Sequence, residues 1–575
     1  MRRSSPVRNV LLWMLIPFIC SALAKVGFAV EPTEEWVARY DGPERGVDGA
    51  MDIGVDGAGN ICVTGRSYVE GFGGDYVTIK YDAEGNEIWV VTYNGPADAD
   101  DLAEALAIDA SNNIYVTGTS HGGATGEDYT TIKYDADGNE LWVARYDGPP
   151  SAGDSGVDIA VDSSGNVYVT GRSEGEGTQE DYATIKYDTS GTELWVARYN
   201  GPGSSDDAAT SLTVDTSGNV YVTGASDEYG VEADYATIKY APNGDVLWVA
   251  RHEAAGGSDG SGGRDLAVDE FGNVFVTGCS EREYVTVKYD GDGNQLWIAR
   301  YDGEGSAGGV HKAVSVAVHP AGGVVVTGWS FSHWLFLSEM YQFATIRYDQ
   351  DGREMWVAHD SGTVGLLNTI LAPSGIPVLT VDPSGNIFVA GTILMINPDN
   401  LDELDFDTIT LKYDSMGNEI WAAQYRGPGD DLDAASALAL DSAGNLYVTG
   451  ISTGIGTLED IATIKYSGQE PFRLRSPENG AALSSAPTFE WTPGIYDAFG
   501  FLTVFHYPVF GYVPIWQWVL DDQFSISDSW WEQVSTGWPS FWNILGVNTT
   551  TWEWDMADPR WFERVASSPE DGDQG

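Results

Sequence analysis

The sequence predicts an all-β fold: an eight-bladed β-propeller of four-stranded blades, closed by its N-terminal strand, plus a small C-terminal β-sandwich-like domain. Three observations predict it. An internal repeat of about 53 residues occurs in eight copies, each copy holds four strand-like runs, and the array begins and ends partway through a copy. The repeat is marked by Trp36, Trp89, Trp142, Trp195, Trp248, Trp297, Trp356 and Trp421.

The second copy shows why each unit is expected to form four strands. Its runs are ALAID (105–109), IYVTG (114–118), YTTIKYD (129–135) and ELWVARY (140–146). They are rich in Val, Ile, Tyr, Thr and Trp, which favour strands. In the third run, Ile132 and Tyr134 alternate with Thr131 and Lys133, which is the two-residue period of a strand. Gly, Asn and Asp, which tolerate positive φ, separate the runs. Such units, repeated in a ring, predict a propeller with the recurring Trp between neighbouring blades.

The two ends of the array predict how the ring closes. The array opens with EEWVARY (34–40), a Trp strand with no blade before it. It stops at IATIKY (461–466), the third strand of a copy that has no Trp strand after it. We expect residues 35–40 to complete the eighth blade, which removes exposed sheet edges.

Composition assigns the segments outside the array. Residues 1–29 are expected to be a signal peptide, because three arginines precede the apolar run 10–24. A retained anchor and a lipoprotein attached at Cys20 are the alternatives. The propeller is expected at 34–467, a Trp-rich C-terminal β module at 468–566 and a disordered tail at 567–575. The protein is therefore expected to be secreted, periplasmic or on the cell surface, with no membrane span in the mature chain. Cys62 and Cys279 offer no disulfide framework.

Two resemblances follow from these motifs. "GNVYVTG", "TIKYD-x-x-GNELW" and "GP-x-x-x-DDA" resemble the SBBP β-propeller repeat of bacterial exported proteins, over about residues 34–467. The resemblance implies the propeller fold and carries no catalytic motif. Residues 471–493 resemble the opening of an Ig-like or fibronectin-III-like module, with a Pro-bounded linker before a strand that contains Trp491.

The charge balance limits the partners. The chain has 86 acidic and 29 basic residues and a formal charge of −57. Such a surface repels nucleic acid, so we expect no nucleic-acid partner. An acidic surface suits metal cations and basic partners. Alternatively, it keeps the protein soluble and makes copies of the chain repel one another. We expect a monomer.

The long loops are the expected functional face. Strands alternate in direction, so the turns after strands one and three share one face and the longer, varied loops after strands two and four share the other. Clustered carboxylates there are calcium candidates, with plain solvation as the alternative. The candidates are Asp98, Asp100, Asp101, Asp206, Asp207, Asp430, Asp431 and Asp433. "DADGNE" (135–140) and "DGDGNQ" (290–295) are expected to be hairpin turns. The aspartate recurring before the third strand, as at Asp128, is expected to make local hydrogen bonds.

An aromatic segment in the sixth blade is the second candidate site. "GWSFSHWLFLSEMYQFAT" (328–345) stands where other blades have short polar loops. It is expected either to bind a ligand, for example by stacking on a sugar ring, or to pack against the C-terminal region. The candidate ligand-binding residues are Trp329, Phe331, His333, Trp334, Phe336 and Tyr341.

These observations favour a non-enzymatic function. None of the seven His residues belongs to an H-E-x-x-H motif, which binds zinc in metalloproteases. The sequence also contains neither the G-x-S-x-G motif of serine hydrolases nor a phosphate-binding P-loop motif. We expect an exported scaffold for binding or cell-surface interaction through the acidic long-loop face, with a protein or glycan ligand and no cofactor besides calcium. The alternative is a secreted polysaccharide hydrolase or lyase with acidic residues at the channel mouth.

Overall fold

The computed structural model divides the chain into two compact units. One is Glu34–Tyr466, and the other consists of Met1–Thr33 and Ser467–Gly575. The structure describes residues 32–468 apart from 44–45, 70–72, 150, 204, 228–232, 254–261, 304–309, 336–337, 360–376, 397–403 and 430. Beyond residue 468 it describes only strands between Arg473 and Arg564. The predicted signal peptide and C-terminal tail lie outside the described residues.

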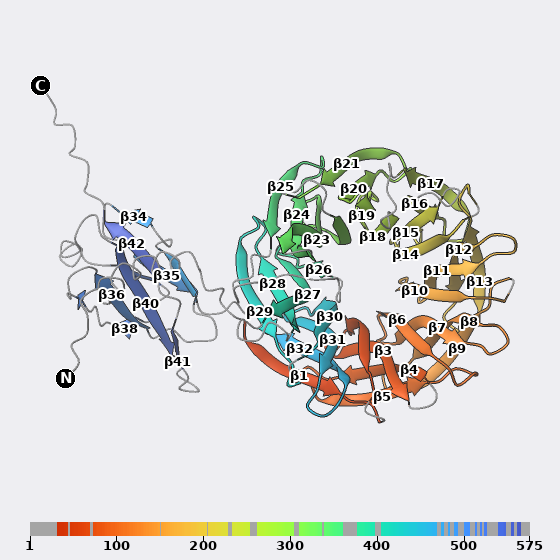
Figure 1. Cartoon of the computed structure of the whole chain (residues 1–575), viewed down its shortest axis with the longest axis horizontal. Helices are drawn as coiled ribbons and strands as arrows, with labels where there is room; N and C mark the ends of the chain where they lie inside the picture. Colours follow the sequence, from red (N-terminus) through yellow and green to blue (C-terminus); the bar gives the residue numbers. More distant parts are fainter. Residues whose placement is uncertain are drawn as a thin grey trace, which may run out of the picture. The chain divides into compact units, whose positions relative to one another are not determined.

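The first unit is an eight-bladed propeller, as predicted (Figure 1). Its eight sheets each contain four antiparallel strands, and the first strand of each blade lies innermost in the ring. Blades one to four are formed by β2 (Gly49–Val55), β3 (Ile61–Val69), β4 (Gly73–Tyr81), β5 (Glu87–Tyr93); β6 (Asp101–Ile108), β7 (Ile114–His121), β8 (Glu127–Tyr134), β9 (Glu140–Tyr146); β10 (Asp154–Val161), β11 (Val167–Glu174), β12 (Glu180–Tyr187), β13 (Glu193–Tyr199); and β14 (Asp207–Val214), β15 (Val220–Asp227), β16 (Ala233–Tyr240), β17 (Val246–His252).

Blades five to eight continue the same order. They are formed by β18 (Gly262–Val268), β19 (Val274–Ser280), β20 (Glu283–Tyr289), β21 (Gln295–Tyr301); β22 (His311–Val318), β23 (Val324–Leu335), β24 (Ser338–Tyr348), β25 (Glu354–His359); β26 (Val378–Val381), β27 (Ile387–Ile396), β28 (Leu404–Tyr413), β29 (Glu419–Tyr425); and β30 (Asp433–Leu440), β31 (Leu446–Thr453), β32 (Glu459–Tyr466) with β1 (Glu34–Tyr40).

The N-terminal strand closes the ring, which confirms the prediction from the chain ends. β1 pairs antiparallel with β32, with Trp36 opposite Lys465 and Tyr40 opposite Ile461. The Trp36 indole N–H and the Lys465 ammonium both donate to the carbonyl of Ala83 in blade one. The closing strand therefore joins the eighth blade to the first through the same contacts that other blades use.

The recurring Trp packs between neighbouring blades. The Trp142 ring lies 6.0 Å from that of Tyr115 in its own blade and 6.2 Å from that of Tyr187 in the next. Its indole N–H donates to Thr189 O of the next blade at 3.2 Å. Lys133 is 7% exposed, lies 4.8 Å above the Tyr115 ring and donates to the same carbonyl. Each aromatic pair of this kind stabilises by roughly 0.5–1.5 kcal/mol beyond area burial, so the strands of one blade are held by the next.

The C-terminal segment contains two sheets. One has the order β33 (Arg473–Ser476), β35 (Thr488–Thr492), β39 (Gln523–Ser525). The other contains β34 (Ala481–Leu483), β36 (Gly500–His506), β37 (Tyr512–Val513), β38 (Trp518–Val519), β40 (Pro539–Val547), β41 (Trp554–Met556) and β42 (Arg560–Arg564). The resemblance to an Ig-like module stays a prediction.

The cysteines and the helices of the described residues bear on two further expectations. Cys62 and Cys279 are buried free thiols. No helix in the described part of the chain is long and apolar enough to cross a membrane.

Candidate functional site

One face of the ring is built from short hairpin turns with a shared hydrogen-bond pattern. Between β8 and β9, Asp135 N donates to Asn139 O at 2.9 Å and Gly138 N to Asp135 O at 3.0 Å. Asp135 Oδ1 accepts the N–H of Asp137 and of Asn139, and the Asn139 side chain contributes most to lowering the pKa of Asp135. Asp290 repeats this pattern. Residues 135–140 and 290–295 are therefore hairpin turns, as expected.

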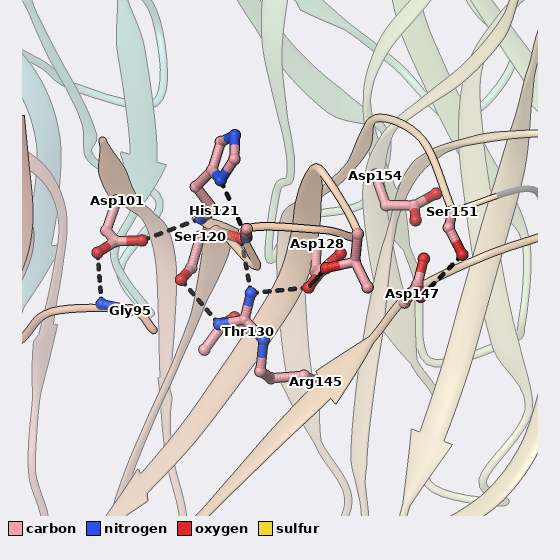
Figure 2. A network of polar contacts seen from close by, with 12 residues as sticks. Gly95, Asp101, Ser120, His121, Asp128, Thr130, Arg145, Asp147, Ser151 and Asp154 are labelled. Carbon is pink, nitrogen blue, oxygen red and sulfur yellow. Dashed lines mark hydrogen bonds and ion pairs between the residues drawn. The ribbon is translucent and has the colours of Figure 1, made fainter. Parts of the chain in front are cut away.

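The opposite face, which we call the long-loop face, carries an arginine network. Arg145, near the end of β9, donates to Asp128 Oδ2 at 2.8 Å, and it binds both the carbonyl and the hydroxyl of Ser120 at 2.8 Å (Figure 2). Equivalent ion pairs join Arg39 to Asp460, Arg198 to Asp181 and Arg251 to Asp234. The aspartate that recurs before the third strand therefore has the local bonding role expected for it in these copies.

The first blade lacks this arginine. Thr92 pairs with Val77 at the register position where Arg145 pairs with Thr130. Burial, with the nearby charges of Asp101 and Asp98, raises the pKa of Asp75 to about 6. A perturbed carboxyl group of this kind is a common feature of functional sites.

The loops that enter the blades are anchored by the aspartate that begins the first strand of the blade, as at Asp101, Asp207 and Asp433. Asp101 is 1% exposed and accepts the N–H of Gly95 at 2.6 Å and that of His121 at 3.1 Å. Asp207 and Asp433 accept the N–H of Gly201 and Gly427 in the same way. These carboxylates satisfy loop N–H groups that would otherwise be buried without a partner.

The structure divides the predicted double-aspartate set. Its buried members are Asp101, Asp207 and Asp433, its exposed members are Asp98, Asp100, Asp206 and Asp431, and Asp430 lies outside the described residues. Calcium at these loops stays a prediction.

A different group of carboxylates could share a cation. Within the described residues, Asp128, Asp147 and Asp154 form the one set of three metal-ligating side chains whose oxygens lie within 4.8 Å of one another. Our sequence reasoning missed it, because its members come from three segments. A recurring spacing could have found them: an aspartate, then Asp or Asn 19 positions later, then Asp after a further 7.

The aromatic segment of blade six forms an extended hairpin rather than a loop. β23 and β24 pair from Val324 opposite Tyr348 up to Leu335 opposite Ser338, with a bulge between Phe331 and His333. Phe331 is 4% exposed, so its ring is buried, and Trp329 is partly buried. His333 and Trp334 lie on β23 and Tyr341 on β24. Phe336 and the side chains of these three residues lie outside the described part, so ligand binding here stays a prediction.

Three partly buried carboxyl groups on inner strands were not predicted. Asp52, Asp158 and Asp265 lie on the first strands of blades one, three and five. Each accepts an N–H from the inner strand of the following blade, at 2.8, 2.6 and 2.8 Å respectively. Burial raises the pKa of Asp158 to about 7, with a smaller contribution from the charges of Asp265 and Asp52. They join blade one to blade two, blade three to blade four and blade five to blade six.

Comparison with known proteins supports the repeat. The model of the SBBP β-propeller repeat matches residues 144–177 and 194–230. An uncharacterized WD repeat-containing protein of Acanthamoeba polyphaga mimivirus is 24% identical over 435 residues, which is 62% of this chain and 28% of that protein. The chain thus spans about a quarter of the length of this curated relative.

Several solved structures are similar at low sequence identity. A protein of unknown function from Bacteroides caccae is 14% identical, with 52% of this chain and 90% of that chain covered and a TM-score of 0.30. A Lactobacillus plantarum protein is 15% identical, with 64% of this chain and 95% of that chain covered and a TM-score of 0.39. A polysaccharide lyase is 10% identical, with 77% of this chain and 94% of that chain covered and a TM-score of 0.39. Similarity at this level carries no argument about function. The geometry shows an eight-bladed β-propeller, and the part of it at residues 144–177 and 194–230 is similar to the SBBP repeat.

Proposed function

We propose that this protein is an exported, non-enzymatic propeller scaffold that binds a protein or glycan ligand, or a cell surface, through its long-loop face. The observation that carries the proposal is the difference between the two faces. The turn face repeats one short geometry from blade to blade. On the long-loop face, the loop between the second and third strands of a blade varies in length. It consists of residues 281–282 in blade five and of residues 122–126 in blade two. Varied loops on a rigid scaffold are where binding residues concentrate.

Exposed carboxylates on the long-loop face favour a partner with cationic groups. Among the described residues, the exposed aspartates in the loops that enter the blades are Asp41, Asp98, Asp100, Asp147, Asp206, Asp302 and Asp431. Charges arranged in this way speed encounter with positively charged groups and make binding sensitive to salt.

The test compares two sets of charge removals in the full-length protein. One variant carries Asp98→Asn, Asp206→Asn and Asp431→Asn on the long-loop face, and the matched control carries Asp137→Asn, Asp292→Asn and Asp351→Asn at exposed turn positions. The wild type is screened on a glycan array and against immobilised basic proteins. We expect binding that weakens several-fold in the first variant and is unchanged in the control. Absence of binding throughout the screen, or equal loss in both variants, would contradict the proposal.

The same screen separates binding from catalysis. Polysaccharides from the array are incubated with the protein, and their chain length is measured afterwards. Unchanged length supports a binding scaffold, whereas shortened chains favour the alternative of a polysaccharide-cleaving enzyme.

A further inference from the structure

Three carboxylates meet at the junction of blades two and three. Asp128 is the second residue of β8, Asp147 directly follows β9, and Asp154 begins β10. One oxygen of each lies within 4.8 Å of the others, and Figure 2 shows the three carboxyl groups grouped beside the Arg145 network. Two strands and a loop from two blades therefore bring three like charges together.

Two of these carboxylates are buried, and one of them, Asp128, has an oxygen without a hydrogen-bond donor. Asp128 is 2% exposed and Asp154 is 1% exposed. Asp128 Oδ2 accepts from Arg145 and from Thr125, whereas its Oδ1 is buried with no hydrogen-bond partner. Asp154 Oδ2 accepts the N–H of Gly148, and the Ser173 hydroxyl donates to the same carboxyl group. A buried oxygen without a donor is costly, so Asp128 Oδ1 has room for a further partner.

The Arg145 guanidinium does not supply a partner for Asp128 Oδ1. The Arg145 guanidinium contacts Asp128 through Oδ2 and directs its other N–H groups to Ser120 and Tyr93. Burial raises the pKa of Asp154. The bonds from Ser173 and Gly148 and the charge of Arg198 oppose that rise, and the charge of Asp128 adds to it. The third member, Asp147, is exposed, with one oxygen bonded to the Ser151 hydroxyl at 3.1 Å. The group is thus open to solvent on the Asp147 side and holds an excess of negative charge.

We propose that Asp128, Asp147 and Asp154 bind a calcium ion that links the second blade to the third. All three ligands are carboxylate oxygens, which suit a hard cation. Calcium–oxygen distances place two ligands of one ion at most about 4.6–5.2 Å apart, which fits the 4.8 Å spacing. Magnesium requires shorter, near-octahedral contacts, and zinc prefers nitrogen and sulfur ligands. Water completes the coordination from the exposed side. The site does not depend on the proposed ligand-binding role.

The repeat supplies an internal comparison for the exposed ligand. At the junctions before and after this one, the positions equivalent to Asp147 are Asn94 and Asn200. An amide oxygen carries no net charge, so the neighbouring junctions are weaker versions of the same arrangement. Asp147→Asn gives this junction the asparagine that the neighbouring junctions have. It removes the charge and keeps an oxygen ligand, whereas Asp147→Ala removes the ligand altogether.

The experiment is isothermal titration of calcium into full-length protein that has been freed of metal by chelation. Because Asp147 is exposed, its variants are expected to fold, and circular dichroism checks this. We expect wild-type binding with a Kd of about 10⁻⁴–10⁻³ M, as in extracellular calcium modules, and a rise in Tm with calcium. Asp147→Ala should lower the calcium stoichiometry by one. Asp147→Asn should weaken this site by about tenfold, which corresponds to removal of roughly one charged contact, and the control Asp137→Ala should titrate like wild type.

Two results would overturn the proposal. One is a wild type that takes up no calcium at concentrations up to about 10 mM, well above that Kd range. The other is an Asp147→Ala variant with unchanged calcium stoichiometry and an unchanged calcium-dependent rise in Tm. A magnesium titration is the metal control, and tighter binding of magnesium than of calcium would contradict the choice of metal. Neither failure would bear on the glycan and basic-protein screen.

Discussion

At the scale of single residues, we expect the aspartates on the inner strands to make the stability of the ring depend on pH. Asp158 accepts the N–H of Ile159 and of Leu212, while burial raises its pKa to about 7. Because this pKa is above the ordinary value of 3.8, the folded state binds the proton more tightly than the unfolded chain does. The contribution of Asp158 to stability is therefore present at acidic pH and is lost as the pH rises through about 7.

Replacing Asp158 should flatten the pH dependence of stability. Ser211 occupies the equivalent position in blade four, so Asp158→Ser uses a side chain that the fold already accepts. One such group changes the free energy of unfolding by at most about 1.4 kcal/mol per pH unit. We expect the wild-type Tm to fall between pH 6 and pH 8, and the variant to fall less, with Asp52 still contributing. Thermal circular dichroism in chelator measures both curves. Parallel curves would contradict the assignment.

The double aspartate before β14 offers a second test at this scale. Asp207 is buried and accepts the N–H of Gly201, whereas Asp206 is exposed. Asp207→Ala leaves that N–H without its partner and should lower the free energy of unfolding by about 1–3 kcal/mol. Asp206→Ala should change it by less than about 0.5 kcal/mol. Urea unfolding gives both values, and equal effects would show that the loop is not anchored in this way.

At the scale of elements, the hairpin turn between the third and fourth strands of a blade lies against the Trp of the preceding blade. Gly138, in the turn between β8 and β9, has a φ of 83°. A Cβ at this position would lie 2.8 Å from the Trp89 ring of the preceding blade. The turn therefore needs glycine both for its backbone and for the indole that lies against it.

Two glycine substitutions separate these effects. Gly59 has a φ of 84°, and no neighbouring atom lies within 4 Å of the point that a Cβ would occupy, so Gly59→Ala introduces backbone strain alone. Gly138→Ala introduces the same strain and also displaces Trp89. We expect Gly59→Ala to cost about 1 kcal/mol, and Gly138→Ala about 1–3 kcal/mol more because overpacking adds to it. Equal Tm values for the two variants would mean that the indole is not held against the turn.

At the scale of the whole molecule, ring closure rests on one short strand. β1 supplies the outer edge of the eighth blade, the contacts of Trp36 with Ala83 O, and the ion pair of Arg39 with Asp460 at 2.8 Å. Without it, β32 becomes an exposed edge and the junction of blades eight and one loses its Trp contact.

Removal of β1 should destabilise the entire propeller. A chain that begins at Asp41 is compared with one that begins at Pro32, which keeps the strand. Loss of a packed Trp alone costs about 3–5 kcal/mol, so we expect a clearly lower Tm and faster proteolysis for the shorter chain. Exposure of β32 should also promote aggregation. Identical melting curves would refute closure by this strand.

The predictions that succeeded are those with a repeated local signal. Trp142, the alternation around Ile132 and the Asp-rich turns recur in many copies, so a strand, its neighbours and its turn type could be predicted together. The aromatic segment of blade six has no such copy. The two-residue period cannot tell a loop from an extension of paired strands, and only the register between Phe331 and Tyr341 shows that the hairpin continues and that the Phe331 ring is buried.

The sequence by itself determined the number of blades, the four strands in each and the pairing of the first strand with the last, because strand periodicity and turn chemistry are local properties that eight copies repeat. Only the tertiary structure decided which aspartates are buried. It places Asp154, at the start of one blade, beside Asp128 of the blade before it. Contacts between blades depend on how twisted sheets pack around an axis, and no spacing along a single strand encodes that distance.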